Sequence, residues 1–136
     1  MSDCLFCKIA SKLIPAEIVF EDEQTVAFLD IHPRAPGHTV VVSRHHSGNL
    51  LDLPDPEVTP LFLAVKRVVQ KIGASLKPNG FTIGLNQGEV SGQTIDHLHI
   101  HVMPRFEGDG GGSIHSVVSN PPEQSLRDIA QKIRQS

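Results

Sequence analysis

Hydrophobic positions recur along the chain with two different spacings, and each spacing predicts a different kind of element. Short runs rich in β-branched and aromatic residues, bounded by turn-forming residues, predict strands at 18–21, 25–29, 38–43, 81–85 and 97–103. Only three polar residues separate the first two runs, which predicts a hairpin. The last two runs are joined through a glycine-containing turn over 86–92, so we expect them to pair antiparallel.

Apolar residues spaced three and four apart predict helices in three other segments. The first covers 4–13 and ends before Pro15. A long amphipathic helix begins at Asp55, which we expect to cap it, has Pro56 in its first turn, and stops at 78–80. The last segment, after 120–122, predicts a C-terminal helix that closes the domain through its apolar residues Leu126, Ile129, Ala130 and Ile133.

These elements predict an α+β fold: a meandering antiparallel sheet of about five strands with one long and one or two short helices. With 136 residues, 39% of them hydrophobic, the chain is long enough for one domain with a substantial core and too short for two. We therefore expect a single domain over 1–136, with its core in 4–106 and a tail and helix in 107–136.

Charge and hydropathy exclude several classes of partner. The net charge of −3 offers no polycationic face for nucleic acid, and no apolar run is long enough to cross a membrane. The N-terminal residues lack the basic and apolar regions of a signal peptide, so we expect a cytoplasmic protein that binds neither nucleic acid nor membrane.

Three of the eight histidines occupy every second position of one predicted strand, at His97, His99 and His101. Side chains two apart on a strand share a face, so we expect three imidazoles on one surface. Imidazole exchanges protons near neutral pH, attacks phosphorus and binds metals. The outer two Cα atoms would lie about 13 Å apart, at the limit of reach for one ion with metal–nitrogen bonds of about 2.0 Å. The pattern therefore favours a catalytic strand over a metal site built from all three histidines.

The only two cysteines form a Cys-x-x-Cys pair at Cys4 and Cys7. Two cysteines cannot build a disulfide framework, so the pair indicates a metal site or a redox couple. A redox couple of the thioredoxin kind would follow a strand, and none precedes this pair. A metal site is favoured, and it requires two more ligands.

At this point the motifs resemble a known family. The segment 92–105, which contains the alternating histidines, resembles the signature of the histidine triad (HIT) superfamily of nucleotide hydrolases and transferases. Residues 28–31 and 36–42 resemble its second hallmark, and 4–9 resembles the start of its small bacterial and archaeal members. The related uridylyltransferase branch carries His-Pro-His, so Leu98 and Ile100 argue against that branch.

The resemblance implies a role for each matching residue. His99 resembles the nucleophile that attacks the α-phosphorus of a nucleotide and forms a covalent nucleotidyl-histidine, from which water releases a nucleoside monophosphate. His101 resembles the residue that contacts the phosphate and assists the leaving group, and His38 the one that orients this network. Asp30 matches the carboxylate that accepts from the ribose hydroxyls. Phosphate contacts match Asn86, Gly92, Gln93 and Thr94.

Apolar residues that match the slot for the base are Leu5, Phe6, Ile9, Phe28 and Ile31. For each of them core packing is an equally good interpretation. The small bacterial members often carry an aromatic residue near position 115, where this chain has His115. Contacts from the tail to a substrate are therefore left open.

The resemblance also implies a structural zinc ion, one per chain, bound by Cys4, Cys7, His46 and His97. His45 stands beside His46 and is an alternative ligand, and reduced free thiols are the alternative to a metal site. Because His99 and His101 stay outside this ligand set, we expect no catalytic metal. Family members pair through the long helix and a sheet edge, so we expect a homodimer.

Together these observations predict an enzyme that hydrolyses a nucleoside phosphoramidate, an aminoacyl-adenylate or a dinucleoside polyphosphate, with a purine nucleotide as substrate. Two other classes remain open. One is a purine-nucleotide binding or scaffolding module with incidental slow hydrolysis. The other is a zinc hydrolase that uses the triad as ligands.

Overall fold

The sheet of the computed structural model, which describes residues 3–136, has five antiparallel strands in the order β1-β2-β3-β5-β4. The strands are β1 (Ile18–Glu21), β2 (Thr25–Leu29), β3 (Thr39–Ser43), β4 (Gly80–Gly84) and β5 (His99–Arg105). The expected α+β fold and five-stranded antiparallel sheet are confirmed. The order departs from a simple meander, because β5 inserts between β3 and β4 and leaves β4 at an edge.

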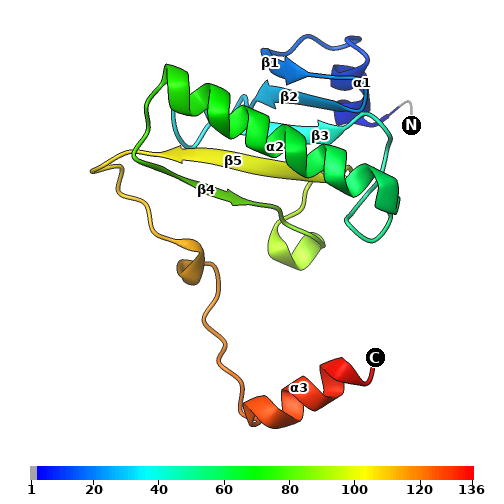
Figure 1. Ribbon diagram of the computed structural model, residues 1–136, viewed down its shortest axis with the longest axis vertical. Helices are drawn as coiled ribbons and strands as arrows, with labels where there is room; N and C mark the ends of the chain where they lie inside the picture. Colours follow the sequence, from blue (N-terminus) through cyan, green and yellow to red (C-terminus); the bar gives the residue numbers. More distant parts are fainter. Residues whose placement is uncertain (1–2) are drawn as a thin grey trace.

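The helices α1 and α2 cover the two faces of this sheet, one on each. The helices are α1 (Leu5–Ala10), α2 (Asp55–Ser75) and α3 (Leu126–Arg134). Figure 1 shows α2 lying along one face. Alternate residues of β3 belong to two separate hydrophobic clusters: Val41 packs in the cluster that contains α2, whereas Val40 and Val42 pack in the cluster that contains α1. Since successive side chains point to opposite faces, α1 and α2 lie on opposite sides of the sheet.

Several boundaries differ from the sequence-based predictions by one to three residues. Strand β5 begins at His99 rather than His97, because the Leu98 N–H bonds to the Ser47 carbonyl (2.6 Å), beyond the end of β3. Asp55 is the first residue of α2 and not its cap; the cap position holds Pro54, with no side-chain hydrogen bond. Residues 11–13 lie beyond the end of α1.

The C-terminal helix does not close the domain, which corrects the prediction made from its apolar spacing. None of its residues is buried, and Figure 1 shows the tail carrying α3 away from the sheet. The helix is amphipathic, but its apolar residues do not pack into the core, and Leu126 and Ile133 are exposed at 78% and 69%.

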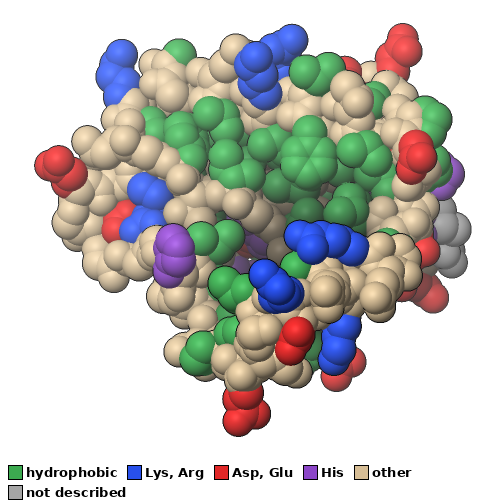
Figure 2. Space-filling model, turned by 60° about the horizontal axis from the view of Figure 1, so that its bottom comes forward, with side chains coloured by type: hydrophobic (Ala, Val, Ile, Leu, Met, Phe, Trp, Pro, Cys, Tyr) green, Lys and Arg blue, Asp and Glu red, His purple; other side chains and the backbone are tan. Residues whose placement is uncertain are grey.

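One face of the molecule gathers hydrophobic side chains into a broad area beside a hollow (Figure 2). Exposed apolar residues include Phe62 and Leu63 on α2 and Ile83 on the edge strand β4. No helix within residues 3–136 combines the length and the hydropathy that a membrane crossing requires.

Candidate active site and metal centre

The strand register aligns four residues, one from each of four neighbouring strands, in a row across the middle of the sheet. Phe28 pairs with Val40, Val40 with His101, and His101 with Gly84, across β2, β3, β5 and β4. His99 lies two residues before His101 on the same face. His99, the candidate nucleophile, and His101 therefore lie between the apolar Phe28 on β2 and Gly84 on β4, which has no side chain.

The backbone fixes which nitrogen of the His99 ring carries the proton when the ring is neutral. Its Nδ1 lies 2.7 Å from the His97 carbonyl oxygen, which can only accept, so Nδ1 carries the proton. In the neutral ring Nε2 then carries the free lone pair. The Phe6 ring packs edge-on against the His99 ring, with centroids 5.0 Å apart, and His99 is only 7% exposed. An imidazole attacks through a free lone pair on one nitrogen while its other nitrogen donates to an acceptor, and His99 meets both conditions.

A chain of hydrogen bonds that starts at a backbone amide determines which nitrogen of neutral His101 carries the proton. The Arg34 N–H donates to His38 Nδ1 (3.1 Å), so neutral His38 carries its proton on Nε2. That Nε2 lies 2.9 Å from His101 Nδ1 and donates to it. His101 therefore presents an Nε2–H donor to the face of the sheet. Burial, as the largest cause, lowers the pKa of both His38 and His101, which favours these neutral forms.

Asp30 stands beside this chain of hydrogen bonds. Its Oδ2 is 3.6 Å from His38 Nε2, and its Oδ1 accepts from the His32 N–H (2.8 Å). It also lines a small cavity of about 130 Å³ between α1 and β2. The five residues predicted for the base slot all line this cavity: Leu5, Phe6, Ile9, Phe28 and Ile31. Phe6, Ile9 and Phe28 also pack in the core, so the core and slot interpretations hold together, whereas Ile31 is 80% exposed.

Of the residues predicted to contact phosphate, Asn86 and Gly92 lie together, since a Cβ on Gly92 would be 3.8 Å from Asn86 Nδ2, whereas Thr94 lines a separate hollow. Asn86 lines the same groove as His101. The N–H groups of Gly92 and Gln93 bond inside their own turn, to the carbonyls of Glu89 (3.0 Å) and Gly88 (3.2 Å). The Gln93 side chain accepts from the Gly88 N–H and donates to the carbonyls of Ile95 and of Gly48, which lies in a different loop. Thr94 lines a different hollow, next to Cys4 and His46.

The predicted metal ligands do converge. One ligand atom from each of Cys4, Cys7, His46 and His97 lies within 4.8 Å of all the others. His97 Nδ1 is 3.3 Å from Cys4 Sγ and 3.5 Å from Cys7 Sγ, and His46 Nδ1 is 3.3 Å from Cys7 Sγ. A tetrahedral ion with bonds of about 2.3 Å to sulfur and 2.0 Å to nitrogen separates such ligands by about 3.5 Å. The cluster therefore fits a metal ion.

The surroundings of the cluster decide which histidines point into it. His97 Nε2 donates to the Ser43 carbonyl (2.9 Å), which leaves Nδ1 facing the thiols as a ligand. His45 turns away, with Nδ1 3.4 Å from a Glu57 carboxylate oxygen, so His46 takes the ligand position. Within residues 3–136 the other cluster of potential ligands is Asp30, His38 and His101, and neither cluster includes His99.

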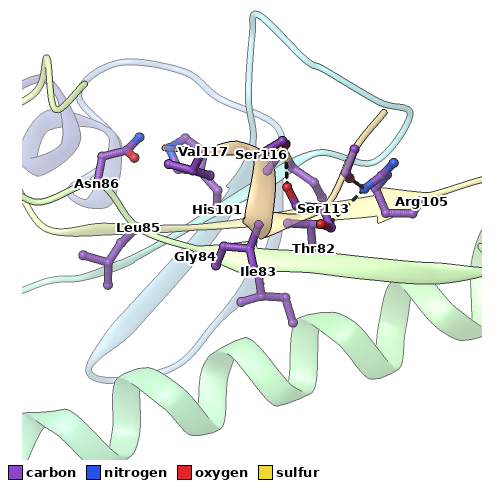
Figure 3. A pocket seen from close by; sticks show the side chains of 13 residues that line it. Thr82, Ile83, Gly84, Leu85, Asn86, His101, Arg105, Ser113, Ser116 and Val117 are labelled. Carbon is purple, nitrogen blue, oxygen red and sulfur yellow. Dashed lines mark hydrogen bonds between the residues drawn. The ribbon is translucent and has the colours of Figure 1, made fainter. Parts of the chain in front are cut away.

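A groove on the β4 side of His101 has no counterpart among the sequence-based predictions. It has a volume of about 370 Å³ and is walled by β4, β5 and the tail turn at 112–117. In Figure 3, Asn86, Ser116 and Val117 lie on the same side of β4 as His101, while Ile83 points toward α2. The alternation of Thr82 and Gly84 on β4 was the signal in the sequence, but only the tail turn makes this surface a groove.

Comparison with known proteins agrees with the fold. The HIT domain matches residues 11–108. A HIT-like protein of Methanocaldococcus jannaschii is 45% identical over 107 residues, which span 79% of this chain and 82% of that one. The adenosine 5'-monophosphoramidase HNT1 of Saccharomyces cerevisiae is 32% identical, over 79% of this chain and 66% of its own. The crystal structure of SMU.412c from Streptococcus mutans UA159 matches with a TM-score of 0.89 at 36% identity, over 99% of this chain and 85% of that one.

An antiparallel sheet that carries a row of oriented imidazoles beside an apolar slot defines a protein of the histidine triad class. The chain belongs to the HIT family. The family and the phosphoramidase relative together support a nucleotide hydrolase in general.

Proposed function

We propose that this protein hydrolyses a nucleotide at its α-phosphate through a covalent nucleotidyl-histidine at His99, and releases a nucleoside monophosphate. The observation that carries the proposal is the 2.7 Å hydrogen bond from His99 Nδ1 to the His97 carbonyl, because it leaves the free lone pair on Nε2, the nitrogen that would attack phosphorus. The expected substrates are nucleoside phosphoramidates, aminoacyl-adenylates and dinucleoside polyphosphates. The yeast relative is named for the first of these activities, which favours it.

The proposed reaction has two steps: transfer of the nucleotidyl group to His99, and its hydrolysis. His99 Nε2 bonds to the α-phosphorus, the bond from phosphorus to the leaving nitrogen or oxygen breaks, and a leaving amine takes up one proton from water. The His97 carbonyl accepts from Nδ1–H while the His99 ring becomes positively charged. Water then attacks phosphorus, loses one proton to solvent, and frees the nucleoside monophosphate and His99. Dividing one displacement into two lowers each barrier.

His101 and Asp30 supply orientation. The His101 Nε2–H is a fixed donor for a phosphoryl oxygen, and donors already in place stabilise charge that develops in a phosphoryl-transfer transition state. Asp30 stands at the mouth of the apolar cavity and can accept from ribose hydroxyls while the base enters that cavity. A purine is the expected base.

Zinc is the ion proposed for the Cys4/Cys7/His46/His97 cluster. A donor set of two thiolates and two imidazoles at tetrahedral spacing is typical of structural zinc. It would tie α1 to the sheet and supply no chemistry at phosphorus, since His99 lies outside the ligand set.

A homodimer is the proposed assembly. The edge strand β4, the exposed apolar residues of α2 and the unburied apolar stripe of α3 all lack a partner within residues 3–136. A second copy would cover such surfaces, which isolated proteins seldom expose together. Light scattering on the purified protein tests this, and a monomer at micromolar concentration would contradict it.

The decisive experiment follows AMP release from adenosine 5'-phosphoramidate by the wild-type protein, His99→Ala, and the control His45→Ala, at an exposed histidine that faces Glu57. We expect His99→Ala to lower kcat by at least about a thousandfold, because the covalent route is lost, and His45→Ala to leave it unchanged. Mass spectrometry of quenched wild-type protein should detect AMP on the peptide that contains His99. A binding or scaffolding module would instead keep its affinity, and its slow turnover would be unaffected by His99→Ala.

A further inference from the structure

Two ligands of the metal cluster and two residues that line the apolar cavity belong to one segment of four residues, Cys4-Leu5-Phe6-Cys7. Leu5 and Phe6 line the cavity between α1 and β2, together with Ile9 one helical turn further on. The N-terminal end of α1 therefore carries half of the metal ligands and one wall of the cavity at the same time.

Phe6 is the side chain of this segment that reaches the alternating histidines. Its ring packs edge-on against the rings of His99, His97 and Phe28, with centroids 5.0, 6.1 and 5.4 Å apart. One of these neighbours is the candidate nucleophile, one is a metal ligand and one lines the cavity. A shift of Phe6 therefore changes the cavity and the packing of the nucleophile together.

The two ends of α1 are attached to the sheet by different groups. At the N-terminal end the thiols of Cys4 and Cys7 contact His97 and His46. At the C-terminal end Arg44 Nη1 donates to the Ala10 carbonyl (2.9 Å). Loss of the metal cluster would therefore free the end that carries Leu5 and Phe6, while the other end keeps its own attachment.

The two sulfur atoms are placed for a competing bond to each other. They lie within 4.8 Å of one another, and Cys4 Sγ accepts from the Cys7 N–H (3.4 Å). Cys4 also lines a hollow of about 360 Å³ at the surface, through which a small oxidant can reach its sulfur. A disulfide has an S–S bond of about 2.05 Å and no thiolate charge, so the oxidised pair cannot serve as metal ligands.

We propose that the oxidation state of Cys4 and Cys7 controls how tightly the apolar cavity binds the base of a nucleotide. The oxidant is a peroxide: one S–S bond forms between the two thiolates, the O–O bond breaks, hydrogen peroxide is reduced to two hydroxide ions, and the divalent cation is released. The N-terminal end of α1 then moves, and the cavity loses the wall made by Leu5 and Phe6. This inference rests on the proposed function, because the base of the nucleotide has to occupy that cavity.

Nucleotide affinity, and not turnover, is the readout. Zinc-loaded reduced protein, before and after one equivalent of hydrogen peroxide, is titrated with AMP and with ribose 5-phosphate by ligand-observed NMR. A chromogenic chelator follows zinc release, and the intact mass reports the disulfide. We expect oxidation to release zinc and to raise Kd for AMP by at least about tenfold, because the base loses one apolar wall. Kd for ribose 5-phosphate, which has no base, should change little, and a dithiol reductant with zinc should restore the affinity for AMP.

Cys4→Asp separates the disulfide from other effects of peroxide. Aspartate is a favourable residue at the cap position that Cys4 occupies, and its carboxylate is a zinc ligand, but the variant has no second thiol with which to form the bond. Its zinc content and its affinity for AMP are compared before and after the same treatment. We expect the affinity to follow the zinc content and to be unchanged by peroxide.

The outcomes separate the two proposals. If the reduced, zinc-loaded protein binds AMP no more tightly than ribose 5-phosphate, the cavity does not bind a base and the proposed nucleotide site fails. If it binds AMP more tightly and oxidation releases zinc without changing that affinity, or if Cys4→Asp responds to peroxide as the wild-type protein does, the control by the thiols is refuted. A protein that binds no zinc, that retains it in peroxide, or that loses its cooperative melting transition on oxidation would also overturn the inference.

Discussion

Replacing His38 by leucine should weaken catalysis by acting through His101 alone. His38 is 3% exposed and donates to His101 Nδ1 across 2.9 Å, so the leucine variant leaves that nitrogen without its donor. Losing the partner of a buried acceptor costs about 1–3 kcal/mol, and because His101 is only partly buried, water can replace some of it. We therefore expect a loss of about 1–2 kcal/mol, which is about 5- to 30-fold in kcat/KM.

A double-mutant cycle isolates this effect. Stopped-flow or quenched single turnovers of adenosine 5'-phosphoramidate would be measured for His38→Leu, His101→Ala and the double variant. Because His38 acts through His101, its loss should have almost no further effect in the His101→Ala background. His38→Gln is the matched control, since its amide nitrogen can occupy the position of Nε2 and keep a donor there. If the two single effects simply add, His38 has an independent role and the proposed chain of hydrogen bonds does not work as described.

Other predictions concern stability. Removing a bound ion from the two-cysteine, two-histidine cluster with a chelator should lower Tm in calorimetry, because α1 loses its link to the sheet; an unchanged Tm would contradict a structural metal. Burial lowers the folded-state pKa of His38 and His101, so below about pH 6.5 the unfolded chain binds more protons and the free energy of unfolding should fall as pH drops, by at most about 1.4 kcal/mol per pH unit for each group. A denaturation midpoint that is constant from pH 7 to 5 would refute this. Gly37→Ala should destabilise by about 1–2 kcal/mol or more, because φ is +87° and a Cβ would lie 2.6 Å from a Leu76 carbon. Gly73→Ala, inside α2 with nothing within 4 Å, should instead stabilise by about 0.5–1 kcal/mol, and urea titrations of both variants check the pair.

Local patterns were enough to predict most elements of the fold. The hairpin of β1 and β2 appears at the predicted residues, because period-two runs and a polar turn are local signals. The pairing of β4 with β5 is also confirmed. The insertion of β5 beside β3 is a long-range choice that no window of sequence contains. The position of α3 escaped prediction for a similar reason: its apolar spacing shows that it is amphipathic but not which surface it packs against, and none of its residues is buried.

Residue types and spacing predicted a smaller part of the candidate site. The convergence of Cys4, Cys7, His46 and His97 followed from the family resemblance, and the choice of His46 over His45 needed the Glu57 contact, which depends on where α2 lies. Gln93 was predicted as a phosphate contact, and that prediction stands untested. Its side chain bonds to the backbone of Gly88, Gly48 and Ile95, and no local pattern could reveal the Gly48 partner, which lies 45 residues away. The Arg34 amide that begins the chain of hydrogen bonds to His101 carries no signal at all in the sequence.

His97 serves two sites through two different parts of the same residue. Its ring faces the thiols, and its main-chain oxygen accepts from the ring of His99. An alanine scan would report only the first contribution, since every amino acid brings the same carbonyl. The group that orients the proposed nucleophile is therefore invisible to ordinary mutagenesis, and only an alteration of the peptide linkage itself would reveal it.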